Sequence, residues 1–366
     1  MLLTAEQKCL LWLSAAEVTP GHVQKLLEEY ETAQGIWEAF GSENGPKFTS
    51  GTQSILKQLH SRDALDGLQE KINLKNVHLL FRDDPEYPEL LASIQDPPYL
   101  LYYAGRLNCL QKPMVALVGT RRSSQYGRDM AASLARGLCE AGVCVVSGLA
   151  RGIDAAAHEA ALQAGGSTVG ILGSGINVPY PPEHTPLLRK IAGGIGLIIS
   201  EYPLDAGPMP FHFPHRNRII SGLSQGVVFV EGRIKSGGMH TVHAALMQGR
   251  EVFAVPGYVG TVGSEGPHAI LREGARIVTS AEELLDDLGL QKKNEAKQVR
   301  NLVPLTPLQE KIVAQLKLER MNPQELSEKL GCSPGELLTE LGTLEILGVV
   351  QREAGNRFYL PLSARQ

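Results

Sequence analysis

Hydrophobic positions divide the chain into three zones. In residues 4–76 apolar side chains recur every three or four positions, as on the buried face of a helix. Leucines at 10, 11 and 13 precede a Thr-Pro-Gly turn signal at 19–21, and the helical spacing resumes at Val23 and Leu26. This pattern predicts a small helical domain over residues 1–76, of the SAM or helix-hairpin type. The acidic run at 28–31 favours a packing module over a hairpin that grips DNA.

In residues 77–290 short apolar runs alternate with Ala-rich or amphipathic helical segments. An apolar run without polar alternation predicts a strand buried on both faces, and therefore a parallel sheet covered by helices. About seven such strands are predicted, at 115–118, 143–147, 168–172, 196–200, 227–231, 251–255 and 276–279. Another short strand is predicted at 100–103, in a turn-rich connecting stretch. The pattern predicts an α/β fold with a doubly wound, Rossmann-like sheet.

The third zone starts after a polar stretch at 291–304, which we interpret as a linker. Asn322 and Ser333 each precede a Pro and, three residues on, a Glu, the pattern that begins a capped helix. With a helix before them and strands at 349–352 and 357–360, they predict a winged-helix domain over residues 305–366. Residues 301–366 hold seven Lys and Arg against eight Asp and Glu, so we expect this domain to contact protein rather than duplex DNA.

Composition narrows the class of protein. A content of 43% hydrophobic and 20% charged residues excludes a disordered chain. The net charge of −4 offers no global basic field, so a nucleic-acid site has to be a local patch. Residues 113–280 carry fourteen Lys and Arg against eleven Asp and Glu, which places such a patch in the sheet domain.

Cysteine usage and hydropathy bear on the compartment. The five cysteines are scattered and form no CxxC pair, which argues against a disulfide framework or a zinc site and fits a reducing environment. No signal-peptide pattern and no apolar run of bilayer length is present. We therefore expect a cytoplasmic protein without membrane contact.

Glycine and hydroxyl residues follow the predicted strands. The first strand leads into Gly119, Thr120, Arg121 and Arg122, where a glycine lets the backbone approach a ligand. The next helix is expected to present free N–H groups, and the arginines can donate to phosphate oxygens. Such a loop predicts an anion site at the carboxyl edge of the sheet, although a structural turn fits it as well. The same edge is expected to receive Ser147, Gly148, Gly173, Ser174 and Ser236.

The densest chemical cluster lies at residues 211–218, with two aromatics, two histidines and two arginines. Phe213 offers a face on which bases can stack, and Arg216 and Arg218 can neutralise phosphates. The alternative is that Phe211 and Phe213 are buried anchors of the loop.

Cofactor and metal sites are not favoured. The glycine-rich run at 173–178 lacks the third small residue of a dinucleotide fingerprint. His240 and His243 have the spacing of half a metal site but lack a third ligand. We expect neither a cofactor nor a metal.

Five motifs resemble the DNA-processing protein A family (DprA, also called Smf), and the resemblance covers nearly the whole chain. The motifs are Val115-Ala-Leu-Val-Gly-Thr-Arg121, Ser147-Gly-Leu-Ala-Arg-Gly-Ile-Asp154, Leu172-Gly-Ser-Gly-Ile-Asn177, Phe213-Pro-His-Arg-Asn-Arg-Ile-Ile-Ser-Gly-Leu-Ser224 and Gly249-Arg-Glu-Val-Phe-Ala-Val-Pro-Gly257.

The resemblance implies an extended Rossmann domain that binds single-stranded DNA without sequence preference. It also implies a homodimer, not an enzyme, that loads the RecA recombinase on DNA during natural transformation. By motif position, the nucleic-acid-binding residues are expected to be Gly119, Arg121, Ser147, Gly148, Gly173, Ser174, Phe213, Arg216, Asn217, Arg218 and Ser236.

One stretch departs from the family pattern. The family usually has Ser-Gly-Ser-Leu-Ile-Thr-Ala-Arg after the fifth strand, where this chain has Ser-Gly-Gly-Met-His-Thr-Val-His at 236–243. The altered stretch loosely resembles the Gly-Gly-x-Gly-Thr loop of nucleotide phosphoribohydrolases. Those enzymes carry a catalytic Glu three residues after the Thr, where this chain has Ala244, so hydrolysis is the weaker alternative.

Overall fold

The computed structural model describes residues 3–290, 305–353 and 355–360 of the 366-residue chain. The chain forms two compact units, residues 1–291 and 292–366. The predicted linker at 291–304 lies outside the described residues.

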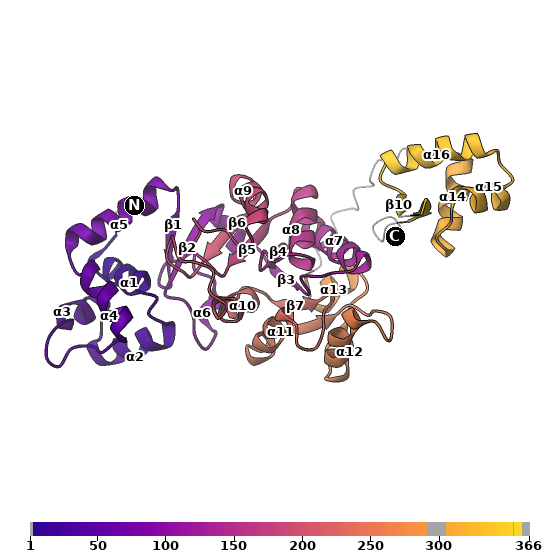
Figure 1. Cartoon of the computed structure of the whole chain (residues 1–366). Helices are drawn as coiled ribbons and strands as arrows, with labels where there is room; N and C mark the ends of the chain where they lie inside the picture. Colours follow the sequence, from indigo (N-terminus) through magenta and orange to yellow (C-terminus); the bar gives the residue numbers. More distant parts are fainter. Residues whose placement is uncertain (1–2, 291–304, 354, 361–366) are drawn as a thin grey trace. The chain divides into compact units, whose positions relative to one another are not determined.

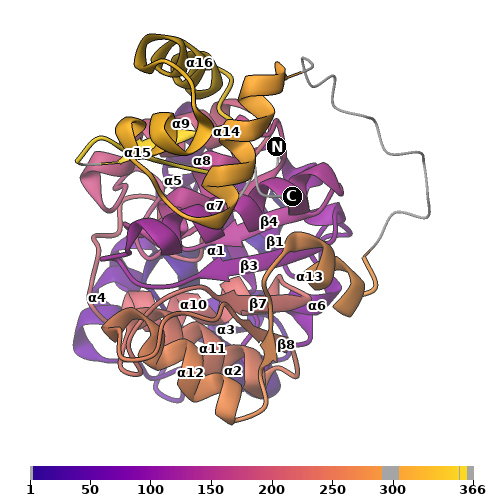
Figure 2. The same cartoon turned by 90° about the vertical axis from the view of Figure 1, so that its right-hand side faces the viewer.

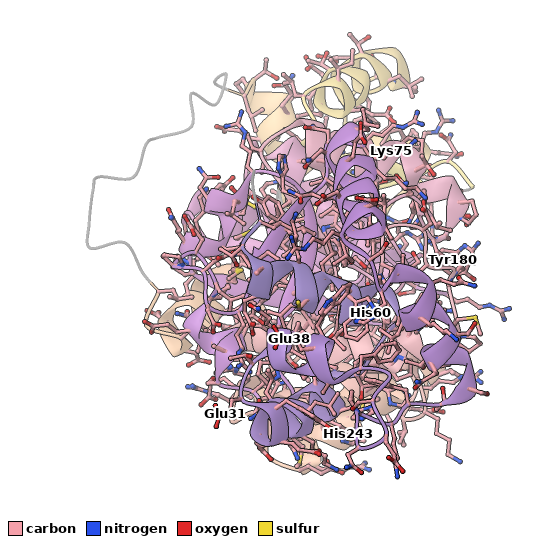
Figure 3. The ribbon with its side chains drawn as sticks, turned by 90° about the vertical axis from the view of Figure 1, so that its left-hand side faces the viewer. Glu31, Glu38, His60, Lys75, Tyr180 and His243 are labelled. Carbon is pink, nitrogen blue, oxygen red and sulfur yellow. The ribbon has the colours of Figure 1, made fainter. Side chains whose placement is uncertain are left out.

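The first unit begins with five helices, which pack around Trp12 (Figure 1). They are α1 Ala5–Ala15, α2 Pro20–Tyr30, α3 Ala33–Ala39, α4 Ser50–Leu59 and α5 Arg62–Leu74. The Trp12 indole is fully buried, lies edge-on to Trp37 at 4.9 Å, and donates from Nε1 to the Leu56 carbonyl at 2.8 Å. Acidic side chains such as Glu31 and Glu38 stay on the outer surface (Figure 3).

The helical segment shares its core with the adjoining sheet. Buried side chains of the first two strands, among them Leu79, Phe81, Leu100 and Tyr102, join the same cluster as Trp12. The five helices and the sheet accordingly belong to one compact unit. A domain boundary at residue 76 stays a prediction.

Within the described part of the first unit, nine strands form one mixed sheet in the order β1-β2-β6-β5-β4-β3-β7-β8-β9. They are β1 His78–Phe81, β2 Leu100–Gly105, β3 Met114–Val118, β4 Cys144–Ser147, β5 Thr168–Leu172, β6 Leu197–Ser200, β7 Gly226–Phe229, β8 Glu251–Ala254 and β9 Arg276–Ile277. The seven strands from β6 to β9 in this order pair in parallel, and β1 and β2 add an antiparallel extension. The doubly wound sheet is as predicted, but the strand at 78–81 was not expected from the sequence.

Helices cover both faces of the sheet (Figures 1 and 2). One face carries α7 Gln125–Glu140, α8 Ile153–Gln163, α9 Thr185–Gly193 and α13 Ala281–Asp287, and the other carries α6 Glu89–Ala92, α10 His212–Gly222, α11 Gly237–Met247 and α12 Glu265–Arg272. Short 3₁₀ turns lie at Leu107–Gln111, Pro182–His184 and Val262–Ser264. Strands β3 to β7 are buried at every position, as their unbroken apolar runs predict.

The described residues of the second unit form three helices and a two-stranded hairpin. They are α14 Pro307–Leu318, α15 Pro323–Leu330, α16 Pro334–Ile346, β10 Gln351–Glu353 and β11 Arg357–Tyr359. Asn322 caps α15 through the predicted capping box, and Ser333 caps α16. Glu336 and Glu345 lie on the exposed surface of α16, which makes this helix a poor reader of a phosphate-lined groove.

Candidate nucleic-acid interface

A cavity of about 640 Å³ lies at the carboxyl edge of the sheet, where β3 and β7 are neighbours. From this pair the chain winds outwards in two directions, through β4 to β6 and through β8 to β9. Such a switch point leaves a crevice in which doubly wound proteins bind ligands. The cavity is lined by Val118, Gly119, Thr120, Arg121, Arg122, Ala150, Asp154, Tyr180, Pro208, Pro210, Phe213, Pro214, Arg216, Asn217, Ile220, Ser236, Gly237, Gly238, His240 and Thr241.

Two free cations stand at the mouth of the cavity. Arg121 and Arg122 follow β3, and both side chains are exposed. Among the residues that the structure describes, neither arginine forms an ion pair with a carboxylate. The guanidinium carbon of Arg121 lies 5.6 Å from the centroid of the Phe213 ring. These arginines are therefore available to a phosphate.

The N-terminus of α7 is not available to an anion, contrary to the expectation from the sequence. The Ser124 side chain caps α7 by accepting from Gly127 N. The Glu231 carboxylate at the end of β7 accepts from Ser124 N at 2.9 Å and from its hydroxyl at 3.1 Å. A carboxylate of the chain itself thus occupies the position that was predicted for phosphate.

The N-terminus of α11 faces the cavity instead. Ser236 is its N-cap residue but makes no side-chain capping bond, and its buried hydroxyl has no hydrogen-bond partner in the described structure. Gly237 and Gly238 line the cavity beside it. A Cβ on Gly238 would lie 2.7 Å from the Phe229 ring and 3.2 Å from Gly119 Cα, so only glycine lets this helix approach β3 so closely. Helix N-termini of this kind bind anions through their free N–H groups.

Arg216 lies buried at the floor of the cavity, and hydrogen bonds hold its guanidinium in place. The residue is 4% exposed, and its Nη1 donates to the carbonyls of Gly148, at 2.8 Å, and Ile171. Burial lowers the pKa of Arg216 to about 10, so the group stays charged at neutral pH. Arg216 also lines the cavity, so its contact with phosphate stays a prediction, while its hydrogen bonds fix the position of its positive charge.

Asp154 faces this buried charge. Its carboxylate accepts from the backbone N–H groups of Gly148 at 3.0 Å and Ala150 at 3.3 Å. Burial raises the pKa of Asp154, and the charge of Arg216 opposes that rise. A Cβ on Gly148 would lie 2.7 Å from Arg216 Nη2 and 2.9 Å from Asp154 Oδ2, which explains the glycine there.

Arg218 does not reach the cavity, which corrects another prediction. Its Nη2 lies 2.6 Å from Glu201 Oε1, and both side chains are nearly buried. Arg216 and Arg218 are two positions apart on α10, which turns their side chains about 200° away from each other. Only one of the two can face the crevice.

Three of the small residues predicted for the site make contacts inside the fold and do not line the cavity. The buried hydroxyl of Ser147 donates to Leu117 O at 2.6 Å, and that of Ser174 donates to Val178 O at 2.7 Å. Gly173 supports Phe213, since a Cβ there would lie 2.8 Å from the ring. None of the three is among the cavity-lining residues.

Phe213 and Tyr180 supply the aromatic wall. Their ring centroids are 5.3 Å apart, and the Phe213 ring is half-buried rather than a core anchor. Phe211, two positions earlier, is 64% exposed. Asn217 links α10 to the start of α11, because its Oδ1 accepts from Arg216 Nε and its Nδ2 donates to Gly237 O.

Several lining residues were not predicted as site residues. They include Thr120, Asp154, Tyr180, Pro208, Pro210 and His240. Arg122, which the sequence had already indicated as a phosphate donor, lines the cavity as well. Thr120 and Asp154 belong to the motifs at 115–121 and 147–154, so proximity to a predicted contact was a usable signal. The two prolines follow β6 and carry no chemical signal by themselves.

In residues 3–290, 305–353 and 355–360, no group of three or more His, Cys, Asp or Glu side chains is placed to hold a metal ion. No helix in these ranges has the length and apolar character needed to cross a membrane. The five cysteines are unpaired.

Comparison with known proteins gives consistent matches. Residues 78–289 match the family model of DNA recombination-mediator protein A, and residues 296–356 match that of the DprA winged helix domain. The Smf protein of Escherichia coli K12 is 45% identical over 213 residues, which are 58% of this chain and 57% of the relative. This region of similarity thus spans little more than half of that relative.

Two solved structures are also similar. DNA processing protein A (DprA) from Streptococcus pneumoniae is 35% identical with a TM-score of 0.68, and the match covers 78% of this chain and 99% of that one. DNA processing protein A from Helicobacter pylori, studied for its single-stranded DNA binding mode, is 30% identical with a TM-score of 0.53, covering 58% and 95%. The sheet domain and the winged helix, matched in order along one chain, place this protein in the DNA recombination-mediator protein A family, DprA/Smf.

Proposed function

We propose that this chain binds single-stranded DNA without sequence preference in the cavity between β3 and β7. The observation that carries the proposal is the pair of unpaired arginines, Arg121 and Arg122, beside the aromatic face of Phe213 and the uncapped N-terminus of α11. The Helicobacter pylori relative, studied for its single-stranded DNA binding mode, supports the same ligand class.

Different groups of the cavity can bind the phosphates and the bases of the strand. The arginines and the α11 N–H groups meet phosphates, while the buried charge of Arg216 adds a fixed positive potential below them. Phe213 and Tyr180 offer faces on which unpaired bases stack, and stacking tolerates every base. In a duplex the faces of the bases are stacked on one another and are not accessible to Phe213 and Tyr180, so we expect the single strand to be preferred.

Binding rather than catalysis is proposed for this cavity. Asp154 is its lining carboxylate, and the carboxylate is held by two backbone N–H groups opposite Arg216. Ala244 stands on α11 where the phosphoribohydrolases place their catalytic Glu. Incubation with AMP is therefore expected to release no free base.

A homodimer that acts in the cytoplasm is the assembly we propose. The outer strand β9 carries Ile277, which is 56% exposed, and an unprotected edge strand is a surface for pairing with a second copy. The free cysteines fit a reducing compartment. The substitution Ile277→Asp should shift the sedimentation of the protein towards the monomer, and an unchanged dimer would assign the contact elsewhere.

We further propose that the bound strand is passed to the RecA recombinase during natural transformation, a role that rests on family membership. Binding is tested first, with homopolymeric strands of thymine, cytosine and adenine. The proposal requires affinities within a few-fold of one another, and a common loss of affinity for Phe213→Ala. Delivery is tested by the rate at which RecA filaments form on the strand, which should rise when the chain is present.

A further inference from the structure

A second cavity, of about 310 Å³, lies between the N-terminal helices and α10. It is lined by Ser14, Glu17, Val18, Thr19, Pro20, Tyr99, Leu100, Glu201, Tyr202, Pro203, Phe211, His212 and His215. None of these residues lines the first cavity. The second cavity is therefore a separate site within the same compact unit.

The first turns of α10 separate the two cavities. Phe213 and Arg216 face the first cavity, while His212 and His215 face the second. An α-helix with its side chains is about 10 Å across, so the two cavities are near neighbours. Phe211, the N-cap residue of α10, lies at the edge of the second cavity and is 64% exposed. This exposed ring is available to stack with a base.

Aromatic side chains form much of the wall. Tyr99 and Tyr202 are each 6% exposed, and the His212 ring stacks on Tyr202 at 3.8 Å with an interplanar angle of 21°. The Phe211 ring meets His212 edge-on at 4.6 Å. A planar heteroaromatic guest can extend such a stack.

Two buried polar atoms of the wall lack hydrogen bonds. His212 is 1% exposed, its Nε2 lies 3.2 Å from Glu17 Oε2, and its Nδ1 has no hydrogen-bond partner in the described structure. Glu201 uses Oε1 for Arg218, whereas its buried Oε2 lies 3.4 Å from His215 Nδ1 without a hydrogen bond. Because unsatisfied buried polar groups are costly, a guest with ring nitrogens and amino groups gains affinity here.

The charge of the site selects the part of a polynucleotide that enters. Glu17 and Glu201 place two carboxylates on the cavity, which disfavours a phosphate. The same carboxylates accept hydrogen bonds from the amino groups of adenine, cytosine and guanine. A base can therefore enter while its phosphate stays with the arginines of the first cavity.

We infer that the second cavity receives one base of the strand whose backbone is bound in the first cavity, and that it favours bases that carry an amino group. This inference rests on the proposed function, since it needs a strand in the first cavity. It adds a base-binding position that the arginine site does not require.

Thr19 offers a matched pair of variants for the test. It lines the cavity, is exposed, and makes no side-chain capping bond at the start of α2. Both Thr19→Trp and Thr19→Ala remove the polar N-cap residue of α2, but only the tryptophan fills the cavity. Phe211→Ala, with the exposed Met209→Ala as its control on the same loop, removes the ring at the edge without touching the core.

The experiment measures the affinity of a short oligonucleotide in which a single abasic site is moved along the strand. In the wild type one position should lose roughly 5- to 150-fold of affinity through this cavity. Thr19→Trp should weaken the intact strand by the same factor and then be insensitive to the abasic site at that position. Thr19→Ala should behave as the wild type.

Two outcomes overturn the inference, and a third overturns the proposed function instead. If Thr19→Trp and Phe211→Ala bind like their controls, the cavity holds only water. If every abasic position affects wild type and Thr19→Trp equally, no base enters. If the wild type fails to bind single strands, or Arg121→Ala leaves affinity unchanged, the proposed binding of single strands in the first cavity is wrong.

Discussion

The substitution Arg121→Ala removes a positive charge at the mouth of the first cavity without disturbing the fold. The side chain is exposed, and its one ring contact in the described structure is the Phe213 face at 5.6 Å. The stability of the chain should therefore be unchanged, while the affinity for single strands falls.

The magnitude follows from the exposure of the side chain. An exposed ion pair contributes about 0–1 kcal/mol and a well-formed charged hydrogen bond about 1.5–3 kcal/mol, so a partly screened arginine–phosphate contact is worth about 1–2 kcal/mol. That free energy corresponds to a roughly 5- to 30-fold higher dissociation constant at low salt. One lost contact also reduces the slope of log affinity against log salt by about 0.7, so the deficit shrinks about fivefold for a tenfold rise in salt.

Fluorescence anisotropy with a labelled single strand at several salt concentrations measures both quantities. Lys190→Ala is the matched control, because it removes the same charge from the last turn of α9, at the opposite edge of the sheet. Equal affinities and equal salt slopes for Arg121→Ala and Lys190→Ala would refute the assignment of the phosphate site.

The remaining predictions concern the floor, the wall and the core of the sheet domain. Asp154→Ala leaves the backbone N–H groups of Gly148 and Ala150 without their buried acceptor, so urea denaturation should show a loss of about 1–3 kcal/mol, and an unchanged midpoint would contradict this role of the carboxylate. Gly173→Ala places a methyl group 2.8 Å from Phe213, so binding of single strands should weaken as it does for Phe213→Ala, whereas wild-type affinity would show that the ring is not held there. Burial lowers the pKa of His158 from the ordinary 6.5 to about 3, so the unfolded chain takes up this proton first as the pH falls. The contribution of the neutral His158 to the free energy of unfolding is therefore complete above pH 6.5 and is lost progressively towards pH 3. In His158→Gln the free energy of unfolding should depend less on pH over this range.

The seven parallel strands were predictable because burial on both faces leaves an unbroken apolar run that few other environments produce. Strand β1 was not predictable, since its four residues gain their strand character by pairing with Leu100–Gly105, some twenty positions later in the chain. The winged helix was predictable from its capping residues, which the structure places at the start of α15 and α16.

For the cavity, the sequence indicated several of the loops that line it but not the direction of each side chain. Arg216 and Arg218 look equivalent in the sequence, yet the helical turn between them sends one into the floor of the cavity and the other to Glu201. The hydrogen bond from Ser124, the N-cap residue of α7, to Glu231 joins residues that are 107 positions apart, which no local pattern reveals. Arg121 and Arg122 are exposed and line the cavity, as expected for residues that follow a glycine turn at the edge of a sheet, and their role in binding stays a prediction.

The central claim is that an unpaired strand fits the crevice between β3 and β7 through phosphate contacts and stacked bases. A titration of the full chain with a single-stranded oligonucleotide and with its duplex, at two salt concentrations, tests it most directly. The account predicts tighter binding of the single strand at both concentrations, with an affinity that falls as salt rises. Equal or tighter binding of the duplex, or binding that does not respond to salt, would contradict it.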